Sequence, residues 1–250
     1  MEPLYFFIFL ITIAFLCEYV DSSLGMGYGT TLTPLLLFMD FEPLHIVPAV
    51  LLSEFATGFS AGFLHNKLGN CDFKKNSEDS KVTLVLASCS IAGTIIAVML
   101  ALTLSKFFVS MYIGILVLSM GLLIIANISW IFSWKKIVGI GVLAAFNKGI
   151  SGGGYGPLVT GGQVISGRNC KNSIGSTSVA EGLVCFVGIL LYAFTISINF
   201  VLAIPLLIGA LLSTPIASIT VKKIDVEKLK RVVGIVVVAL GIFTLLKVLL

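Results

Sequence analysis

Charged side chains are scarce in this sequence. They make up 11% of its 250 residues, whereas soluble domains carry about 25%. Hydrophobic residues account for 58% and mean hydropathy is +1.10. Several apolar runs approach the roughly 20 residues that a helix needs to cross a bilayer. The chain therefore lacks the water-facing surface of a soluble domain, and its composition predicts an all-α polytopic membrane protein that contacts the lipid bilayer.

Residue sets that serve metals, cofactors and hydrolases are also missing. The five cysteines show no metal spacing such as C-x-x-C, so we interpret them as free buried thiols and expect no metal or other cofactor. The two histidines, His45 and His65, fall near predicted membrane edges. The serine in "GISGG" (149–153), a match to G-x-S-x-G, therefore has no base expected beside it. No nucleic-acid signature appears either, and we expect neither an enzyme nor a nucleic-acid partner.

One stretch conflicts with a continuous membrane helix. "NKGISGGGYGP" at 147–157 interrupts an apolar segment with glycines and a proline. In lipid, a backbone polar group without a partner costs roughly 2–7 kcal/mol. Broken backbone at that depth needs a protein-lined or wet cavity around it, so the stretch predicts a binding site.

The sequence repeats itself at an offset of 127 residues. At this offset "GMGYGTTLTP" (25–34) aligns with "GGGYGPLVTG" (152–161), and Glu54 aligns with Glu181 without a gap. Two glutamates in register behind two matching glycine loops predict a duplicated half. We assign residues 1–127 to the first repeat and 128–250 to the second.

Each repeat is expected to begin with an apolar segment that breaks at its glycines and then resumes. The first of these segments has no basic region before it and no cleavage site, so we expect it to be retained rather than removed as a signal peptide. The broken segments are expected at 4–20 with 30–39 and at 131–146 with 157–166. Uninterrupted spans are expected at 44–64, 82–104, 107–126, 172–194, 200–220 and 232–250.

The basic residues decide between two paths for the broken segments. If each turns back as a re-entrant hairpin, thirteen Lys and Arg residues fall on one side and two on the other; if each crosses once, the split is eight against seven. Only the hairpins give the cytoplasmic excess of the positive-inside rule. Three full crossings per half then invert the second repeat and leave both termini outside, as in many secondary transporters. The thirteen are Lys67, Lys74, Lys75, Lys81, Lys135, Lys136, Arg168, Lys171, Lys222, Lys223, Lys228, Lys230 and Arg231.

The second limb of each hairpin is expected to begin near mid-membrane, at Thr30 and at Pro157. Proline suits a helix start, and each start presents free N–H groups and about half a positive charge. Two starts that converge on one cavity would form an anion site. The expected substrate-binding residues are Ser22, Ser23, Gly25, Gly27, Tyr28, Gly29 and Thr30 in the first repeat and Lys148, Ser151, Gly152, Gly153, Gly154, Tyr155 and Gly156 in the second.

Charged residues at depth are the candidates for coupling. Lys148 either attracts an anionic substrate or pairs with Asp21, its equivalent in the first repeat. Glu54 and Glu181 lie mid-span, where a carboxylate costs several kcal/mol unless it is paired or protonated. They either exchange a proton during transport or stay neutral and bond a freed carbonyl. We predict that Glu54, Glu181 and Asp21 couple or gate transport, and that Glu18 braces the hairpin.

The two segments "DSSLGMGYGTTLTPLLL" and "NKGISGGGYGPLVTGG" resemble the sulfite exporter TauE/SafE family, also called the toluene-sulfonate uptake permease group. The resemblance covers essentially the whole chain, and the twin glycine loops are its most specific feature. It implies a carrier of sulfur-containing anions in the inner, cytoplasmic membrane, with sulfite, sulfoacetate or another organosulfonate as substrate.

Residues and resemblance together predict a secondary transporter with the anion bound mid-membrane between the glycine loops and with protons as coupling ion. The alternative is a passive anion channel, which would need no coupling carboxylates. The sequence is also compatible with a homodimer.

Overall fold

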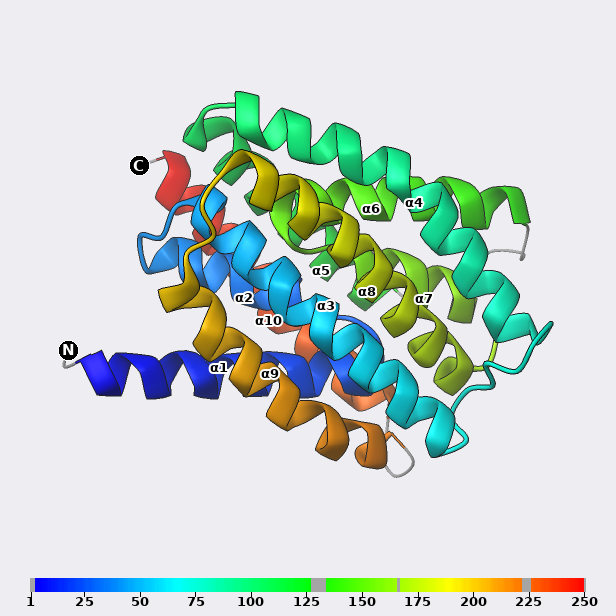
Figure 1. Cartoon of the computed structure of the whole chain (residues 1–250). Helices are drawn as coiled ribbons and strands as arrows, with labels where there is room; N and C mark the ends of the chain where they lie inside the picture. The colour runs from blue at the N-terminus through cyan, green and yellow to red at the C-terminus, as the bar shows by residue number, and fades with distance from the viewer. Residues whose placement is uncertain (1–2, 127–133, 166, 222–225, 250) are drawn as a thin grey trace.

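The computed structural model describes residues 3–126, 134–165, 167–221 and 226–249, which form ten α-helices and contain no strand (Figure 1). The boundary expected between the repeats, at 127 and 128, lies outside the described residues, as do Lys222, Lys223 and the side chains of Lys136, Lys228, Lys230 and Arg231. The helices are α1 (Pro3–Leu24), α2 (Tyr28–Phe38), α3 (Pro43–Lys67), α4 (Glu78–Thr103), α5 (Lys106–Ala126), α6 (Trp134–Ser151), α7 (Tyr155–Ile165), α8 (Cys170–Thr195), α9 (Phe200–Thr220) and α10 (Val226–Leu249).

The first limb of each hairpin is longer than the sequence suggested. We expected breaks after residues 20 and 146, but α1 continues to Leu24 and α6 to Ser151. Nothing before Gly25 and Gly152 stops the helix, and these two glycines have φ values of +68° and +74°, which other residues rarely adopt. Polar residues that we assigned to the breaks therefore lie on helices, with side chains in fixed directions.

The second limbs also begin earlier than expected. The starts predicted at Thr30 and Pro157 are wrong by two residues, because α2 begins at Tyr28 and α7 at Tyr155. Pro157 is tolerated as the third residue of α7 because N–H groups in a first helical turn have no partner within the helix. Each turn between limbs is thus only three residues long, at 25–27 and 152–154.

The two limbs of the first hairpin return to the same end of the molecule. Phe6, near the start of α1, stacks on Phe41, just after α2, with ring centroids 6.2 Å apart. The second hairpin, α6 and α7, has both of its ends at the opposite end of the molecule (Figure 1). The hairpins therefore approach the centre from opposite directions.

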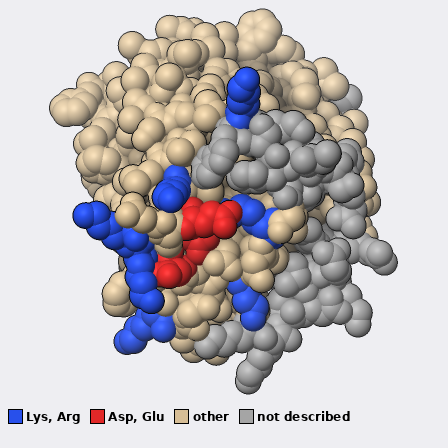
Figure 2. Space-filling model, turned by 90° about the vertical axis from the view of Figure 1, so that its right-hand side faces the viewer, with Lys and Arg blue, Asp and Glu red and all other residues tan. Residues whose placement is uncertain are grey.

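Basic side chains gather at the end where the second hairpin begins and ends. Figure 2 shows this end, with blue side chains around a small acidic patch. We call it the lysine-rich end; its exposed lysines among the described side chains are Lys67, Lys74, Lys75, Lys81, Lys135 and Lys171. At the opposite end Lys106 lies 3.6 Å from Glu42, and Lys247 lies 2.7 Å from Asp40.

Six helices of the described chain are long and apolar enough to cross a membrane: α1, α3, α4, α5, α8 and α9. This set differs from the six full spans that we expected, because it includes α1. It omits α10, whose apolar described part, Gly234–Leu249, falls short of the length required. Together these helices make the chain a multi-pass, membrane-embedded protein.

The helix contacts repeat when the two halves are exchanged. α1 packs on α9 as α6 packs on α4, and α9 contacts α3 as α4 contacts α8. The equivalent helices α3 and α8 run antiparallel, since Gly58 lies against Gly182 and Gly188 against Leu51. α5 and α10 are also antiparallel. Glycines at these crossings allow the backbones to approach closely, as in other membrane bundles.

Candidate functional site

The two glycine turns meet at the centre of the bundle. A Cβ atom on Gly29 would lie 1.7 Å from the carbonyl oxygen of Gly152, and one on Gly156 would lie 2.4 Å from that of Gly25. The hydroxyl of Thr160 donates a hydrogen bond of 2.8 Å to the same Gly25 oxygen. Backbone therefore packs directly on backbone, which explains the glycines at these positions.

The N-terminus of α2 is capped by a carboxylate. Asp21, in the last turns of α1, accepts a hydrogen bond of 3.1 Å from the backbone N–H of Tyr28. The turn before α7 uses a hydroxyl instead: Ser151 Oγ accepts from the Gly153 N–H at 3.1 Å and donates to the Asn147 carbonyl at 2.6 Å. In this structure the half-helix start that we expected to attract an anion thus holds a carboxyl group of the protein.

Lys148 joins the two halves of the chain. Its side chain is only 1% exposed, and Nζ contacts Oε2 of Glu54 and lies 2.7 Å from Oε1 of Glu181. Glu54 comes from α3 and Glu181 from α8. Among the described residues Lys148 makes no ion pair with Asp21, the partner that we had considered. The two side chains are directed differently: Asp21 caps α2, and Lys148 reaches the glutamates between α3 and α8.

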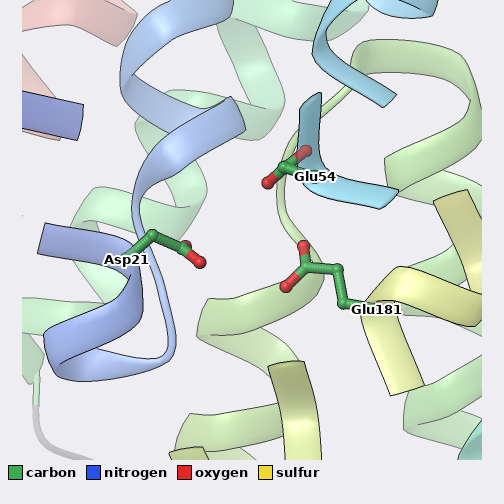
Figure 3. A group of neighbouring side chains, drawn as sticks. All are labelled: Asp21, Glu54 and Glu181. Carbon is green, nitrogen blue, oxygen red and sulfur yellow. The ribbon is translucent and has the colours of Figure 1, made fainter. Parts of the chain in front are cut away.

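Carboxyl groups outnumber this single ammonium. Asp21, Glu54 and Glu181 face one another in Figure 3 and offer oxygens that lie within 4.8 Å of one another. Glu18 is buried beside them and, like them, is at most 8% exposed. Ionised carboxylates in excess at such a depth cost several kcal/mol each. Their charge must be balanced by protons or by a bound cation.

A small cavity lies among these carboxyl groups. Its volume is about 10 Å³, enough for about one water molecule. Ser22 donates a hydrogen bond of 2.6 Å to Glu18 Oε1, and Glu18 Oε2 has no partner among the described groups. The cavity is lined by Glu18, Asp21, Glu54, Thr57, Gly58, Ala61, Ser178 and Glu181.

A hydrogen-bonded chain holds the first hairpin in position. The carbonyl of Ser22, near the end of α1, accepts from His65 Nε2 at 3.1 Å, and Asn70 Nδ2 donates to the other ring nitrogen at 3.0 Å. Ser53 donates a hydrogen bond of 2.9 Å to the hydroxyl of Tyr28. These contacts fix both limbs of the hairpin to α3.

The predicted site residues thus fall into two neighbouring groups. The carboxylate cluster contains Asp21, Ser22, Lys148, Glu54 and Glu181. The second group consists of buried residues in and beside the two turns: Ser23, Gly25, Gly27, Tyr28, Gly29, Thr30, Ser151, Gly152, Gly153, Gly154, Tyr155 and Gly156. Of these, Gly25, Gly29 and Thr30 lie against Gly152, Gly153 and Gly156 of the opposite turn.

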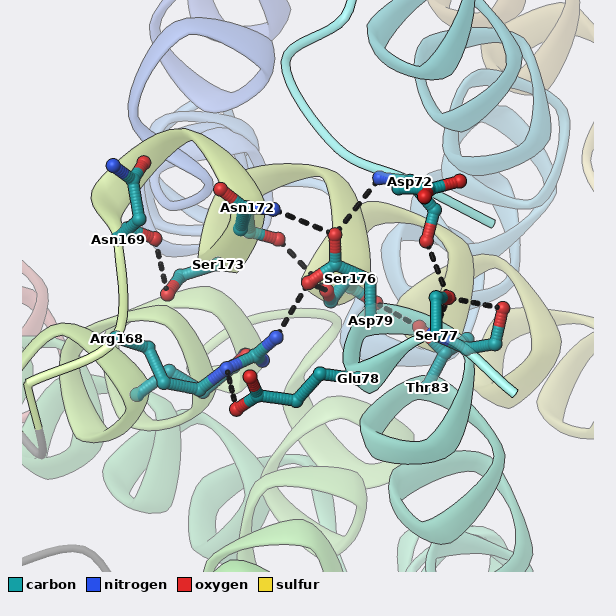
Figure 4. A network of polar contacts seen from close by, with 12 residues as sticks. Asp72, Ser77, Glu78, Asp79, Thr83, Arg168, Asn169, Asn172, Ser173 and Ser176 are labelled. Atoms are coloured by element: carbon teal, nitrogen blue, oxygen red, sulfur yellow. Dashed lines mark hydrogen bonds and ion pairs between the residues drawn. The ribbon is translucent and has the colours of Figure 1, made fainter. Parts of the chain in front are cut away.

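A second charged network was not predicted from the sequence (Figure 4). Arg168, just after α7, lies 2.5 Å from Asp79 and 3.2 Å from Glu78 at the start of α4, and it also bonds to Gln163 of α7. Asp79 accepts a further hydrogen bond of 2.7 Å from Asn172 of α8. We had interpreted Arg168 only as a signal of topology. Asp79 is an ordinary acidic residue in the first turn of a helix, and Arg168 lies in a loop, so no local signal in the sequence pointed to their contact.

The fold and the site together define a helical membrane protein with a buried charged centre between two broken helices. Residues 10–244 match the sulfite exporter TauE/SafE family. The chain belongs to this family. It is 27% identical over 254 aligned residues to a protein of Bacillus subtilis (strain 168) named as a probable membrane transporter protein, YtnM, and the alignment covers 94% of this chain and 81% of that one. No solved structure matches the chain.

Proposed function

We propose that this protein is a secondary transporter that carries sulfur-containing anions across the cytoplasmic membrane and couples their movement to protons. The family name, sulfite exporter, supports a substrate of the class of sulfite, sulfoacetate or other organosulfonates. The observation that carries the proposal is the position of Lys148. Its buried ammonium contacts Glu54 from the first half of the chain and Glu181 from the second half.

We propose inverted repeats, with α1–α2 and α6–α7 as re-entrant hairpins. The exchange symmetry of the helix contacts supports this arrangement, and so do the antiparallel equivalents α3 and α8. An axis in the membrane plane relates halves in this way in many secondary transporters. By the positive-inside rule the lysine-rich end then faces the cytoplasm and both termini lie outside.

The anion is proposed to bind where the turns meet the carboxylate cluster. Two half-helix starts point toward this region, and each offers N–H groups and partial positive charge. Lys148 adds a full charge. Glu54 and Glu181 contact Lys148 directly, so their protonation state and the anion affinity are linked through one group.

A passive channel is the alternative function. The centre of the described structure favours a carrier, because its cavity is about the size of one water molecule and the two turns pack directly against each other. A channel also has no need for carboxylates beside the only buried ammonium of the described residues.

Flux in proteoliposomes tests the proposal. Labelled sulfite and sulfoacetate would be offered with and without an imposed pH gradient, for wild type, Glu54→Gln, Glu181→Gln and the exposed control Glu42→Gln. We expect saturable, gradient-driven accumulation that either buried substitution uncouples and the control preserves. Flux that does not saturate would favour the channel, and no flux of either anion would contradict the substrate class.

Cysteine labelling tests the orientation separately. Single cysteines at 40–45 and 196–199 are expected to react from outside, and those at 66–81 and 167–171 from the cytoplasm. Reaction of 40–45 from the cytoplasm would contradict the inverted arrangement.

A further inference from the structure

Two groups at the centre of the bundle, a helix N-terminus and a lysine ammonium, can bind an anion. In this structure both are in contact with carboxyl groups of the protein. The first is the N-terminus of α2, where Asp21 accepts the Tyr28 N–H at 3.1 Å. The second is the ammonium of Lys148, which contacts Glu54 and Glu181. A carboxylate and a sulfonate present the same kind of acceptor oxygens to N–H donors, so the one can replace the other.

We propose that Asp21, Glu54 and Glu181 are resident substitutes for the transported oxyanion, and that taking up protons makes them release Lys148 and the α2 N-terminus to it. The proposal rests on the transport function proposed above and names the groups that perform the coupling. A proton moves from solvent to a carboxylate oxygen, and an N–H···O bond to that carboxylate is replaced by an N–H···O bond to the sulfonate.

The charge balance of the cluster favours this exchange. Counting Glu18, four carboxyl groups lie around one lysine, so an added anion would increase the excess of carboxylate charge unless that charge is compensated at the same time. Protonation of a carboxylate in the cluster removes one negative charge at the place where the anion binds. The ionisable groups within electrostatic reach are Cys17, Glu18 and Asp21 of α1, Tyr28 of α2, Glu54 of α3, Lys148 of α6, Tyr155 of α7 and Glu181 and Cys185 of α8.

Groups that could complete the anion site are already buried nearby. Glu18 lines the cavity, and the hydroxyl of Thr33 lies 3.1 Å from where a Cβ on Gly152 would be. Neither Glu18 Oε2 nor the Thr33 hydroxyl has a hydrogen-bond partner among the described groups. Both side chains are at most 2% exposed. Buried polar groups generally have a hydrogen-bond partner. A bound oxyanion could accept a hydrogen bond from the Thr33 hydroxyl and another from a protonated Glu18.

Binding of sulfoacetate to the purified protein as a function of pH tests the exchange. This probe is chosen because its sulfonate keeps its charge across the neutral range. Calorimetry in two buffers of different ionisation enthalpy counts the protons taken up with the anion. We expect proton uptake by the wild type and an affinity that rises as pH falls, by up to about tenfold per pH unit for each proton. If the wild-type protein bound sulfoacetate without taking up protons, this result alone would overturn the proposed exchange.

The variants identify the groups. Glu54→Gln and Glu181→Gln imitate the protonated form, so each should bind sulfoacetate more tightly than wild type at alkaline pH and lose part of the pH dependence. Lys148→Gln should lose binding at every pH, and the exposed control Glu42→Gln should follow wild type. Weaker binding in the Glu54 and Glu181 variants with an unchanged pH dependence would overturn the exchange and leave the transport function standing. Absence of binding and flux for both sulfoacetate and sulfite would overturn both proposals.

Discussion

Replacing Gly29 by alanine tests the contact between the two hairpins. The new Cβ would lie 1.7 Å from Gly152 O and 2.6 Å from its carbonyl carbon, whereas non-bonded heavy atoms are most stable about 3.5–4.0 Å apart. The turns would therefore have to separate by roughly 1.5 Å or more. Backbone atoms form the obstacle, so no side-chain rotation can relieve it.

Overpacking of this kind typically costs about 1–3 kcal/mol. With roughly 2–4 °C per kcal/mol for a chain of this size, we expect the melting temperature of Gly29→Ala in detergent to fall by about 2–12 °C. Separation of the turns would also shift Lys148, which lies four residues before Gly152 on α6, relative to Glu54 on α3, so flux should fall at a temperature where the protein is still folded.

Gly161→Ala is the matched control. It lies in the same region of the fold, on α7, and a Cβ there would meet nothing within 4 Å. Alanine in a helix interior is more favourable than glycine by about 0.5–1 kcal/mol, so this variant should melt at or slightly above the wild-type temperature. If Gly29→Ala melted and transported like Gly161→Ala, the turns would not be in contact and the site described here would be wrong.

Three further outcomes are expected. Asp79→Ala leaves the guanidinium opposite it without its buried partner, which should cost about 3–5 kcal/mol and lower the melting temperature far more than removal of the exposed Glu78 carboxylate would. Lys247 donates a hydrogen bond to Asp40 and lowers the pKa of that carboxyl group. The Lys247–Asp40 pair should therefore stabilise the protein at neutral pH and lose this effect as pH falls through the lowered pKa. Asp40→Asn should remove this pH dependence from melting curves recorded in acid. Burial raises the pKa of the Cys71 thiol to about 12, so maleimide should label it slowly at neutral pH although it lies at the lysine-rich end, and rapid labelling would contradict its burial.

The sequence predicted most of the helices because apolar length and glycine breaks are local signals. It also indicated the residues of the centre, since carboxyl groups inside an apolar helix are costly and therefore conspicuous. Partners were harder to predict. Which carboxylate Lys148 contacts depends on how α3 and α8 cross, and the extension of α6 by five residues beyond 146 decides where its side chain points.

The network of Arg168 and Asp79 was out of reach for a similar reason. The two residues are 89 positions apart, and each has an ordinary role in its own surroundings, as a loop arginine and as an acidic residue at a helix start. Only the packing of α4 against α8 brings them together. Contacts between distant, individually unremarkable residues carry no local signal.

The packing of α1 on α9 has a consequence for how the protein is made. α1 leaves the ribosome early, but the helix that covers it begins at Phe200, 176 residues after Leu24 (200 − 24). At about 5–20 residues per second, translation of this interval takes roughly 9–35 s. For that time Glu18 and Asp21 must wait in or beside the membrane without α9, and for the first part of it also without Lys148. We therefore expect insertion errors and recognition by membrane quality control to occur mainly in this interval, while the N-terminal hairpin is inserted but α9 has not yet been made.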